Sequence, residues 1–413
     1  MLHRRDTIRL FWTACALLFV FSMIARPKTV YEGAVFGLSA WWNIVFPSLL
    51  PFFIVSELLM NFGVVHFMGI LLEPVMRPLF NVPGAGSFVL AIGYTSGYPI
   101  GAMVTARLRE QRLCTRIEAE RLMSFTSNSS PLFMLVAVAV GMFHDPALGP
   151  LVAGAHYLSN LTVGLFMRFY GRCDREFIPP PAATGHIVKR AFGEMFARQR
   201  QDNRTLGQII GDAVKNAINN LLNIGGFIIL FAVIIRLLAE AGFIEMLARG
   251  LGALFLPLGL SPNVLPALAS GLFEMTTGTK MAAEAAAPLA HRLVAVAMIL
   301  AWSGFSVQAQ AASMIAGTDI RMAPFVLSRV AHAILAAIYT AILFGPATPL
   351  ARAVVRPVFA PATGAGEEIS LWTITHLPLF MFLFFLAAII LLAALVVILG
   401  RVRLFIIGPP HRG

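Results

Sequence analysis

The sequence predicts an all-α, polytopic membrane protein built from two inverted repeats, each carrying a re-entrant hairpin. Its mean hydropathy is +0.80, and 58% of its residues are hydrophobic against 12% charged. A soluble domain carries about 25% charged residues. Many apolar runs approach or exceed the roughly 20 residues that cross a bilayer. The pattern in which polar, Gly-rich residues interrupt these runs also occurs twice, so that Gly63 corresponds to Gly242 and Gly101 to Gly278.

The apolar runs divide the chain into a regular series of predicted helices. In order, they lie at 9–26, 36–61, 64–80, 84–105, 124–143, 147–170, 213–240, 243–258, 261–282, 290–316, 324–346 and 375–400. Two of them, 64–80 and 243–258, are short for a crossing. Their internal Glu73, Arg77 and Arg249 suit amphipathic helices that lie in the membrane plane.

These helices group into six predicted units. The run after His3-Arg4-Arg5 is followed by no convincing small-residue cleavage site, so it is interpreted as an uncleaved anchor rather than a signal peptide. The units are an N-terminal anchor helix (1–30), a first repeat (31–170), a basic linker (171–210), a second repeat (211–347), a second linker (348–374), and a C-terminal transmembrane helix with its tail (375–413).

Charge predicts the orientation. The net charge is +11 and the pI about 10.3, but Lys and Arg cluster in the loops, as expected of loops that face the cytoplasm. No nucleic-acid reader motif accompanies them, which argues against nucleic acid as a partner. The chain is therefore expected to be a multi-pass protein of the cytoplasmic membrane. Its predicted cytoplasmic segments are 1–8, 106–122, 171–210, 317–323 and 401–413.

This orientation inverts the second repeat. Segment 36–61 would run inward and its counterpart 213–240 outward. For both to hold, 84–105 and 261–282 must each enter and leave the membrane on one side, as hairpins with their tips near mid-membrane. Irregular backbone at that depth is tolerated only where protein or a water-filled cavity surrounds it. Broken segments in corresponding positions of two repeats are typical of a transporter's binding site.

The first predicted tip, 93–101, contains three Gly and one Pro, which interrupt a helix and free backbone polar groups. A half-helix that begins there would point its positive end at a ligand. The alternative is a kinked helix that packs through small residues. The candidate binding residues at this tip are Ser96, Gly97, Pro99 and Gly101.

The second tip carries two ionisable groups, Glu274 and Lys280, inside an apolar stretch, where a charge costs at least about 2.5 kcal/mol. Lys280 could attract an anionic substrate and Glu274 could couple transport to a proton or cation. Alternatively, the two could form a structural pair. The candidates at this tip are Glu274, Thr276, Thr277, Gly278 and Lys280.

Each hairpin is followed by a predicted helix with a polar opening, at 124–131 and 302–310. Hydroxyls and amides supply hydrogen-bonding groups for a ligand without the cost of a buried charge. Hydrogen bonds between helices are the alternative interpretation. The candidates are Thr126, Ser127, Asn128, Ser129, Ser303, Ser306 and Gln310.

Several chemistries find no support in the sequence. The histidines His66, His144, His156, His291, His332 and His376 show no ligand-like spacing, and surface or interface positions are expected for most. The three cysteines, Cys15, Cys114 and Cys173, are expected to be free thiols. Neither a Walker A sequence nor a Gly-x-Ser-x-Gly elbow is present. We therefore expect no metal, no cofactor and no enzymatic activity.

The segments at 41–53, 63–65, 72–80, 96–102 and 124–126 form specific motifs of the first half. Through them, the chain resembles the YlbJ-type sporulation integral membrane proteins over roughly 30–350. Such proteins contain the nucleoside-recognition (Gate) domain, which is similar to the hairpin-bearing half of concentrative nucleoside transporters. The resemblance implies a role in endospore formation, in the mother-cell membrane around the forespore. It also implies transport of dipicolinic acid, a small aromatic dianion.

Three functions remain open at this point. The preferred one is a secondary carrier or facilitator for a small anionic aromatic metabolite, with dipicolinic acid as the implied substrate. The second is a nucleoside or nucleobase transporter, and the third is a membrane scaffold for spore envelope assembly. The expected partners are a small anionic substrate and the lipid bilayer, and a homo-oligomer is left open.

Overall fold

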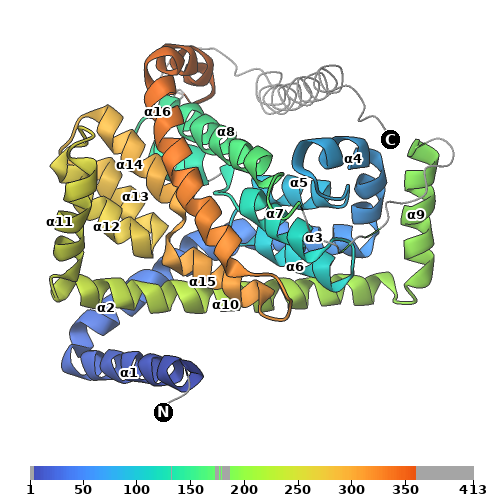
Figure 1. The fold of residues 1–413 in the computed structure, drawn as a ribbon, viewed down its shortest axis with the longest axis horizontal. Coiled ribbons are helices and arrows are strands. Elements are labelled where there is room, and N and C mark those ends of the chain that lie inside the picture. Colours follow the sequence, from blue (N-terminus) through green and yellow to red (C-terminus); the bar gives the residue numbers. More distant parts are fainter. Residues whose placement is uncertain (1–3, 132, 173–175, 177, 179–186, 360–413) are drawn as a thin grey trace, which may run out of the picture.

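The computed structural model describes residues 4–359, apart from 132, 173–175, 177 and 179–186. Every regular element in this part of the chain is helical (Figure 1), which confirms the all-α prediction. The predicted C-terminal helix 375–400, Cys173 and His376 lie outside the described residues. The second linker is described only to 359, where it continues the last helix instead of interrupting it.

The first half begins with two helices that meet at Arg26 and continue through a π-helical turn. Its elements are α1 (Arg4–Ala25), α2 (Pro27–Ala40), η1 (Trp41–Val45), α3 (Phe46–Asn61), α4 (Val64–Phe80), α5 (Gly86–Ser96), α6 (Ile100–Glu110), α7 (Arg116–Thr126), η2 (Phe133–Met142), η3 (Pro146–Leu148) and α8 (Gly149–Met167).

The second half follows a helix of the basic linker, α9 (Ile187–Gln201), which packs on α4. Its elements are α10 (Leu206–Glu240), α11 (Phe243–Phe255), η4 (Pro262–Val264), α12 (Leu265–Phe273), α13 (Met275–Glu284), α14 (Leu289–Trp302), α15 (Gly304–Ile315) and α16 (Met322–Phe359).

The order of elements repeats between the halves. A left-handed glycine, Gly63 or Gly242, joins a long helix to the next one. A hairpin of two short helices follows (α5–α6, then α12–α13), then a broken helix (α7–η2, then α14–α15), then a long helix (α8, then α16). The structure thus places the breaks where the sequence predicts them. The inversion of one copy relative to the membrane stays a prediction.

The polar stretch after the first hairpin is not the opening of one helix, as predicted, but a gap between two. Helix α7 begins earlier, at a capping box in which Thr115 and Glu118 exchange hydrogen bonds, and ends at Thr126. Residues 127–130 are non-helical before η2. Pro131 explains this gap, because a proline disfavours helical backbone in the residue that precedes it. Short polar side chains add to this effect by competing for backbone groups.

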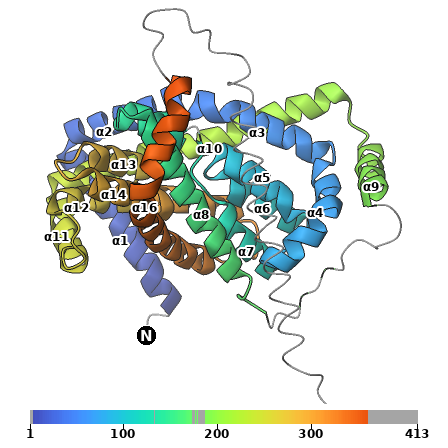
Figure 2. The ribbon, with the colours of Figure 1, turned by 90° about the horizontal axis from the view of Figure 1, so that it is seen from above.

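Helix α10 runs along both halves and forms their common wall (Figures 1 and 2). It packs on α2 and α3 of the first half and on α15 of the second. The backbones of α2 and α10 approach so closely that a Cβ added to Gly37 would lie 2.8 Å from the Ile229 Cα. The Trp41 indole nitrogen donates to the Leu221 carbonyl across the same contact, at 3.0 Å.

Among the described residues, three helical stretches are long and apolar enough to cross a membrane: Leu206–Glu240, Leu289–Ile315 and Met322–Phe344. Two bent pairs raise the number to five if each counts as one span. In one of them, Phe53–Asn61 and Val64–Phe80 meet at 82°. This bend suits the prediction that 64–80 lies in the membrane plane. These features describe an integral membrane protein.

Candidate functional site

The tips of both hairpins meet at one cavity of about 620 Å³. Most of its polar lining comes from the breaks in α5–α6, α7–η2 and α12–α13, from α15 and from Asn43 of η1, and most of its apolar lining from α2, α3, η1, η2 and α10. The lining residues are Phe36, Gly37, Asn43, Val45, Pro47, Ser96, Gly97, Tyr98, Ser129, Ser130, Phe133, Val136, Ala137, Ile224, Ile228, Ala232, Glu274, Met275, Thr276, Ser306, Val307 and Gln310.

Glycine shapes the first tip. Gly97 has φ +84° and ψ −168°, a backbone conformation open essentially to glycine alone. A Cβ at this position would also lie 2.8 Å from the backbone nitrogen of Ser130. The tip therefore sits directly on the gap between α7 and η2, and Gly93 and Gly101 both press against the carbonyl of Thr126.

The second tip is closed by its own carboxylate. Glu274 precedes α13 and accepts hydrogen bonds from the N–H groups of Thr276 and Thr277, both at 2.7 Å. The side chain thereby caps the first turn of α13. The break at Ser303 and Gly304 packs against this tip, with the Gly304 Cα facing the Glu274 backbone.

Polar side chains from both halves line the cavity. Ser96 and Ser129 are about 1% exposed, and their Oγ atoms have no hydrogen-bond partner in the described structure. Gln310 donates to the Ser306 Oγ at 3.4 Å. Buried polar groups are ordinarily satisfied, but the Oγ atoms of Ser96 and Ser129 each expose less than 1 Å² and are therefore not open to a ligand in this conformation.

Of the predicted binding residues, seven line the cavity: Ser96, Gly97, Ser129, Glu274, Thr276, Ser306 and Gln310. Eight others lie in the packing behind it: Pro99, Gly101, Thr126, Ser127, Asn128, Thr277, Gly278 and Ser303. In that layer the Asn128 side chain accepts a hydrogen bond from Asn160. These eight residues shape the tips rather than face the cavity.

Lys280 is predicted to face the substrate, but it does not line the cavity. It is exposed on α13, is absent from the cavity lining, and forms no ion pair with Glu274 in the described structure. A helix explains the separation, because positions six residues apart do not share a face. No lysine, arginine or histidine stands among the described lining residues.

One buried cation is not among the site residues predicted from the sequence. Arg329, in α16, is fully buried, and its guanidinium binds the carbonyls of Ser124 and Ser127 at the end of α7. His156 and His332 are fully buried beside it, with ring centroids 4.6 Å apart. These two histidines are exceptions to the expectation of surface or interface positions, which was made for most of the histidines. A signal was available, since an arginine inside the apolar run 324–346 is a functional candidate by position alone.

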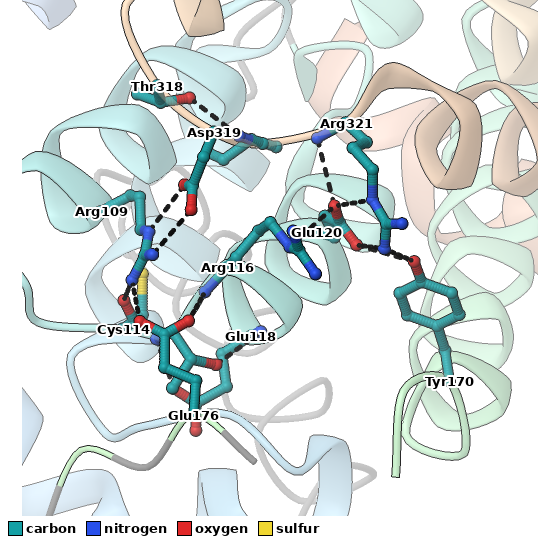
Figure 3. Close-up of polar contacts among 12 residues, drawn as sticks. Arg109, Cys114, Arg116, Glu118, Glu120, Tyr170, Glu176, Thr318, Asp319 and Arg321 are labelled. Atoms are coloured by element: carbon teal, nitrogen blue, oxygen red, sulfur yellow. Dashed lines mark hydrogen bonds and ion pairs between the residues drawn. The ribbon is translucent and has the colours of Figure 1, made fainter. Parts of the chain in front are cut away.

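The charges of the predicted cytoplasmic face form a separate network (Figure 3). Arg109 of α6 binds Asp319 through two contacts of 2.8 Å, and Arg321 binds Glu120 of α7 at 2.8 Å. Tyr170 donates to the same Glu120 carboxylate at 2.7 Å. These bonds join the α15–α16 loop of the second half to α6 and α7 of the first.

The network holds two carboxylates in the ionised form. The hydrogen bonds from Arg109 lower the pKa of Asp319. Burial acts to raise the pKa of Glu120, but the hydrogen bonds from Arg321 and Tyr170 outweigh it, and its pKa lies below the ordinary value. Because the folded-state pKa lies below the unfolded one, each ion pair stabilises the fold above about pH 4. The contribution is lost as the pH falls through the folded-state pKa.

We therefore expect Glu120→Gln to lower the free energy of unfolding at neutral pH by about 1–3 kcal/mol, because Arg321 loses a charged acceptor. The variant should also lose part of the wild-type stability change between neutral and acid pH. Thermal unfolding of the purified protein across this range would measure both effects. Glu245→Gln, at an exposed position of α11, is the matched control. An equal pH dependence in wild type and Glu120→Gln would contradict the assignment.

Among the described residues, no group of three or more His, Cys, Asp and Glu is placed to hold a metal ion. Cys15 and Cys114 are free, as predicted.

Comparison with known proteins places these features in a family. The Gate family model, described as nucleoside recognition, matches residues 43–146. The sporulation integral membrane protein YlbJ of Bacillus subtilis (strain 168) is 47% identical over 335 residues, which cover 79% of this chain and 80% of that protein. An uncharacterized protein of Alkalihalophilus pseudofirmus is 28% identical over 167 residues, 39% of this chain and 34% of the relative.

A solved structure of CNTnw in an outward-facing state aligns with a TM-score of 0.38 and 15% identity, over 84% of this chain and 87% of that one. The extended match to YlbJ confirms the resemblance carried by the sequence motifs. The chain belongs to the family of the sporulation integral membrane protein YlbJ.

Proposed function

We propose that the chain is a membrane transporter, a secondary carrier or facilitator, that moves dipicolinic acid during endospore formation. The observation that carries the proposal is the cavity at which both hairpin tips meet, with polar side chains from both halves in its wall. Membership of a sporulation family supports the setting.

The cavity suits a small aromatic acid in two ways. Its apolar wall, which includes Phe36 and Phe133, can pack against a ring. Its polar wall offers hydroxyl and amide donors to carboxylate oxygens, from the accessible lining residues Asn43, Ser130 and Thr276. Movement of one or both hairpins would open the cavity to either side of the membrane in turn.

Glu274 is the proposed coupling group. It is the only carboxylate among the described lining residues, and it belongs to the tip of a hairpin. Binding a proton or cation there would offset its repulsion of an anionic substrate, so substrate and co-ion would enter together.

A second candidate function is a nucleoside or nucleobase carrier. Two observations favour it: the match of residues 43–146 to a nucleoside-recognition model, and the absence of cationic side chains among the described lining residues. A neutral ligand with several hydroxyls would hydrogen-bond the polar lining without needing a cation in the wall.

Purified protein in liposomes, offered labelled dipicolinate and labelled uridine in parallel, separates these functions. Saturable dipicolinate uptake that unlabelled dipicolinate competes away is the expected result. Uridine uptake without dipicolinate uptake would replace the first function by the second. If neither compound is taken up or bound, the result would favour the membrane scaffold over both transport functions. Liposomes without protein provide the baseline.

Lys280 gives a sharp test of which charges matter. Because its side chain is exposed and outside the lining, we expect Lys280→Gln to change the initial uptake rate by less than about twofold, since a solvated charge is strongly screened. Uptake should be normalised to the amount of protein in the liposomes. A loss of most of the uptake at unchanged protein level would return Lys280 to the role of an anion-attracting residue.

A further inference from the structure

Arg329 is a buried cation whose contacts are all neutral. Its guanidinium donates to the Ser127 carbonyl at 2.8 Å, to the Asn160 side-chain oxygen at 3.0 Å, and to the Ser124 carbonyl. It also meets the His332 Nδ1 at 3.1 Å. Among the described residues, no carboxylate lies within ion-pair distance of it, whereas Arg77, Arg107, Arg109 and Arg321 each have one.

The hydrogen bonds also fix the charge of the two neighbouring histidines. The Ser129 N–H donates to the His156 Nε2 at 3.2 Å, so that nitrogen carries no proton. The His332 Nε2 lies 2.9 Å from the His156 carbonyl and must donate to it, while its Nδ1 faces the guanidinium and must accept. Each ring therefore carries one proton and is neutral. Arg329 holds the single charge of the cluster.

This charge lies directly behind the first hairpin tip. The Tyr98 hydroxyl is 3.5 Å from the guanidinium, and Tyr98 itself lines the cavity. The cluster also holds Ser129, another lining residue, through His156. An intramembrane charge is costly and is retained chiefly where it serves a function. Capping the carbonyl end of α7 uses the arginine's donors, but a neutral donor could do the same without an unbalanced charge.

We propose that Arg329 makes the cavity select anions. Its positive potential acts on the ligand through the first tip and opposes that of Glu274 on the second. This inference deepens the transporter function proposed above and rests on it. It assigns the charge preference to a residue that orients and polarises the lining without touching the ligand.

The test compares two ligands of the same shape in each variant of the full-length protein. Pyridine-2,6-dicarboxylate is the dianion, and pyridine-2,6-dicarboxamide is its neutral counterpart. The measured quantity is the ratio of their dissociation constants, which does not depend on the folded fraction. Arg329→Lys keeps the charge and Arg329→Gln removes it. Asn160→Asp keeps the arginine but supplies a carboxylate 3.0 Å from it, and Lys280→Gln is the control charge outside the cavity.

Wild type is expected to bind the dianion at least about tenfold more tightly than the diamide, as a unit charge at short range in a protein interior can provide. Arg329→Gln and Asn160→Asp should each reduce the ratio by about tenfold through weaker dianion binding alone. Arg329→Lys and Lys280→Gln should preserve it.

Three results would overturn the inference. The first is a wild-type protein that binds no anion or shows no preference for the dianion. The second is an affinity ratio that is unchanged in both Arg329→Gln and Asn160→Asp, and the third is an equal loss of affinity for both ligands in these variants. An equal loss of both affinities would show that Arg329 only stabilises the packing around the cavity. The wild-type protein must show the preference for the dianion, so the inference can be contradicted even if a variant folds poorly. Flux is measured separately. Selective binding of the dianion without flux would refute the transporter function but not the role of Arg329. Flux without a preference for the dianion would refute the role of Arg329 but not the transporter function.

Discussion

Gly97→Ala should abolish most transport. The φ of +84° and ψ of −168° at Gly97 are strained for any residue with a Cβ, at about 1–3 kcal/mol. The added methyl group would also meet the Ser130 backbone at 2.8 Å, where no flexible side chain can move aside. The first tip must therefore shift away from the gap after α7 and misplace Ser96 and Tyr98. We expect the initial uptake rate to fall by at least about tenfold, since misplacing binding groups by an ångström is this costly.

A matched substitution separates this local effect from a general one. Gly154 lies inside α8 with open space around the position of a Cβ. Alanine is favoured over glycine in a helix by roughly 0.5–1 kcal/mol, so Gly154→Ala should keep full uptake and unfold at the same or a higher temperature. Normal uptake by Gly97→Ala at normal protein level would show that the tip does not shape the site.

The second large effect is expected from Glu274→Gln. Thr276 and Thr277 donate to different oxygens of the Glu274 carboxylate, and glutamine replaces one of these oxygens by an NH2 group that cannot accept, so one of the two 2.7 Å bonds is lost. The helix start is weakened by about 1–2 kcal/mol. The cavity also loses its only carboxylate among the described lining residues. Uptake should fall by at least about tenfold and no longer respond to an imposed proton or sodium gradient.

Glu284→Gln is the control, because Glu284 lies exposed at the other end of the same helix. Wild type and this control should respond alike to each gradient. Uptake by Glu274→Gln that still follows the proton or sodium gradient would remove Glu274 from the coupling mechanism, whatever its effect on rate.

The sequence predicts the hairpin breaks well, because Gly and Pro act locally. Gly97 and Glu274 lie at the helix breaks that the residue pattern predicts, and both tips reach one cavity, but the capping role of Glu274 is seen only in the structure. The sequence predicts the polar gap at 127–130 less well. Pro131 explains why the gap ends where it does. The gap begins where α7 ends, and α7 itself starts at the Thr115 cap, inside a segment predicted to be a loop.

The charges show the limit of such predictions. Lys280 and Glu274 are close in sequence, yet the helix that begins at Glu274 turns Lys280 outward. Arg329 and His156 are far apart in sequence, and only the packing of α16 against α8 and α7 brings them together. Burial of a side chain between elements depends on tertiary contacts, which neither periodicity nor charge count can supply from one sequence.

The close contact of α2 with α10 has a consequence for how such a protein comes into being. Gly37 and Trp41 belong to the first copy, and the Ile229 and Leu221 backbone that they touch belongs to the second. Part of the cavity wall on α10 therefore becomes available only after the ribosome has made more than half of the chain. Until then the contacts of Gly37 and Trp41 cannot form, so folding of the first half depends on helix α10 of the second.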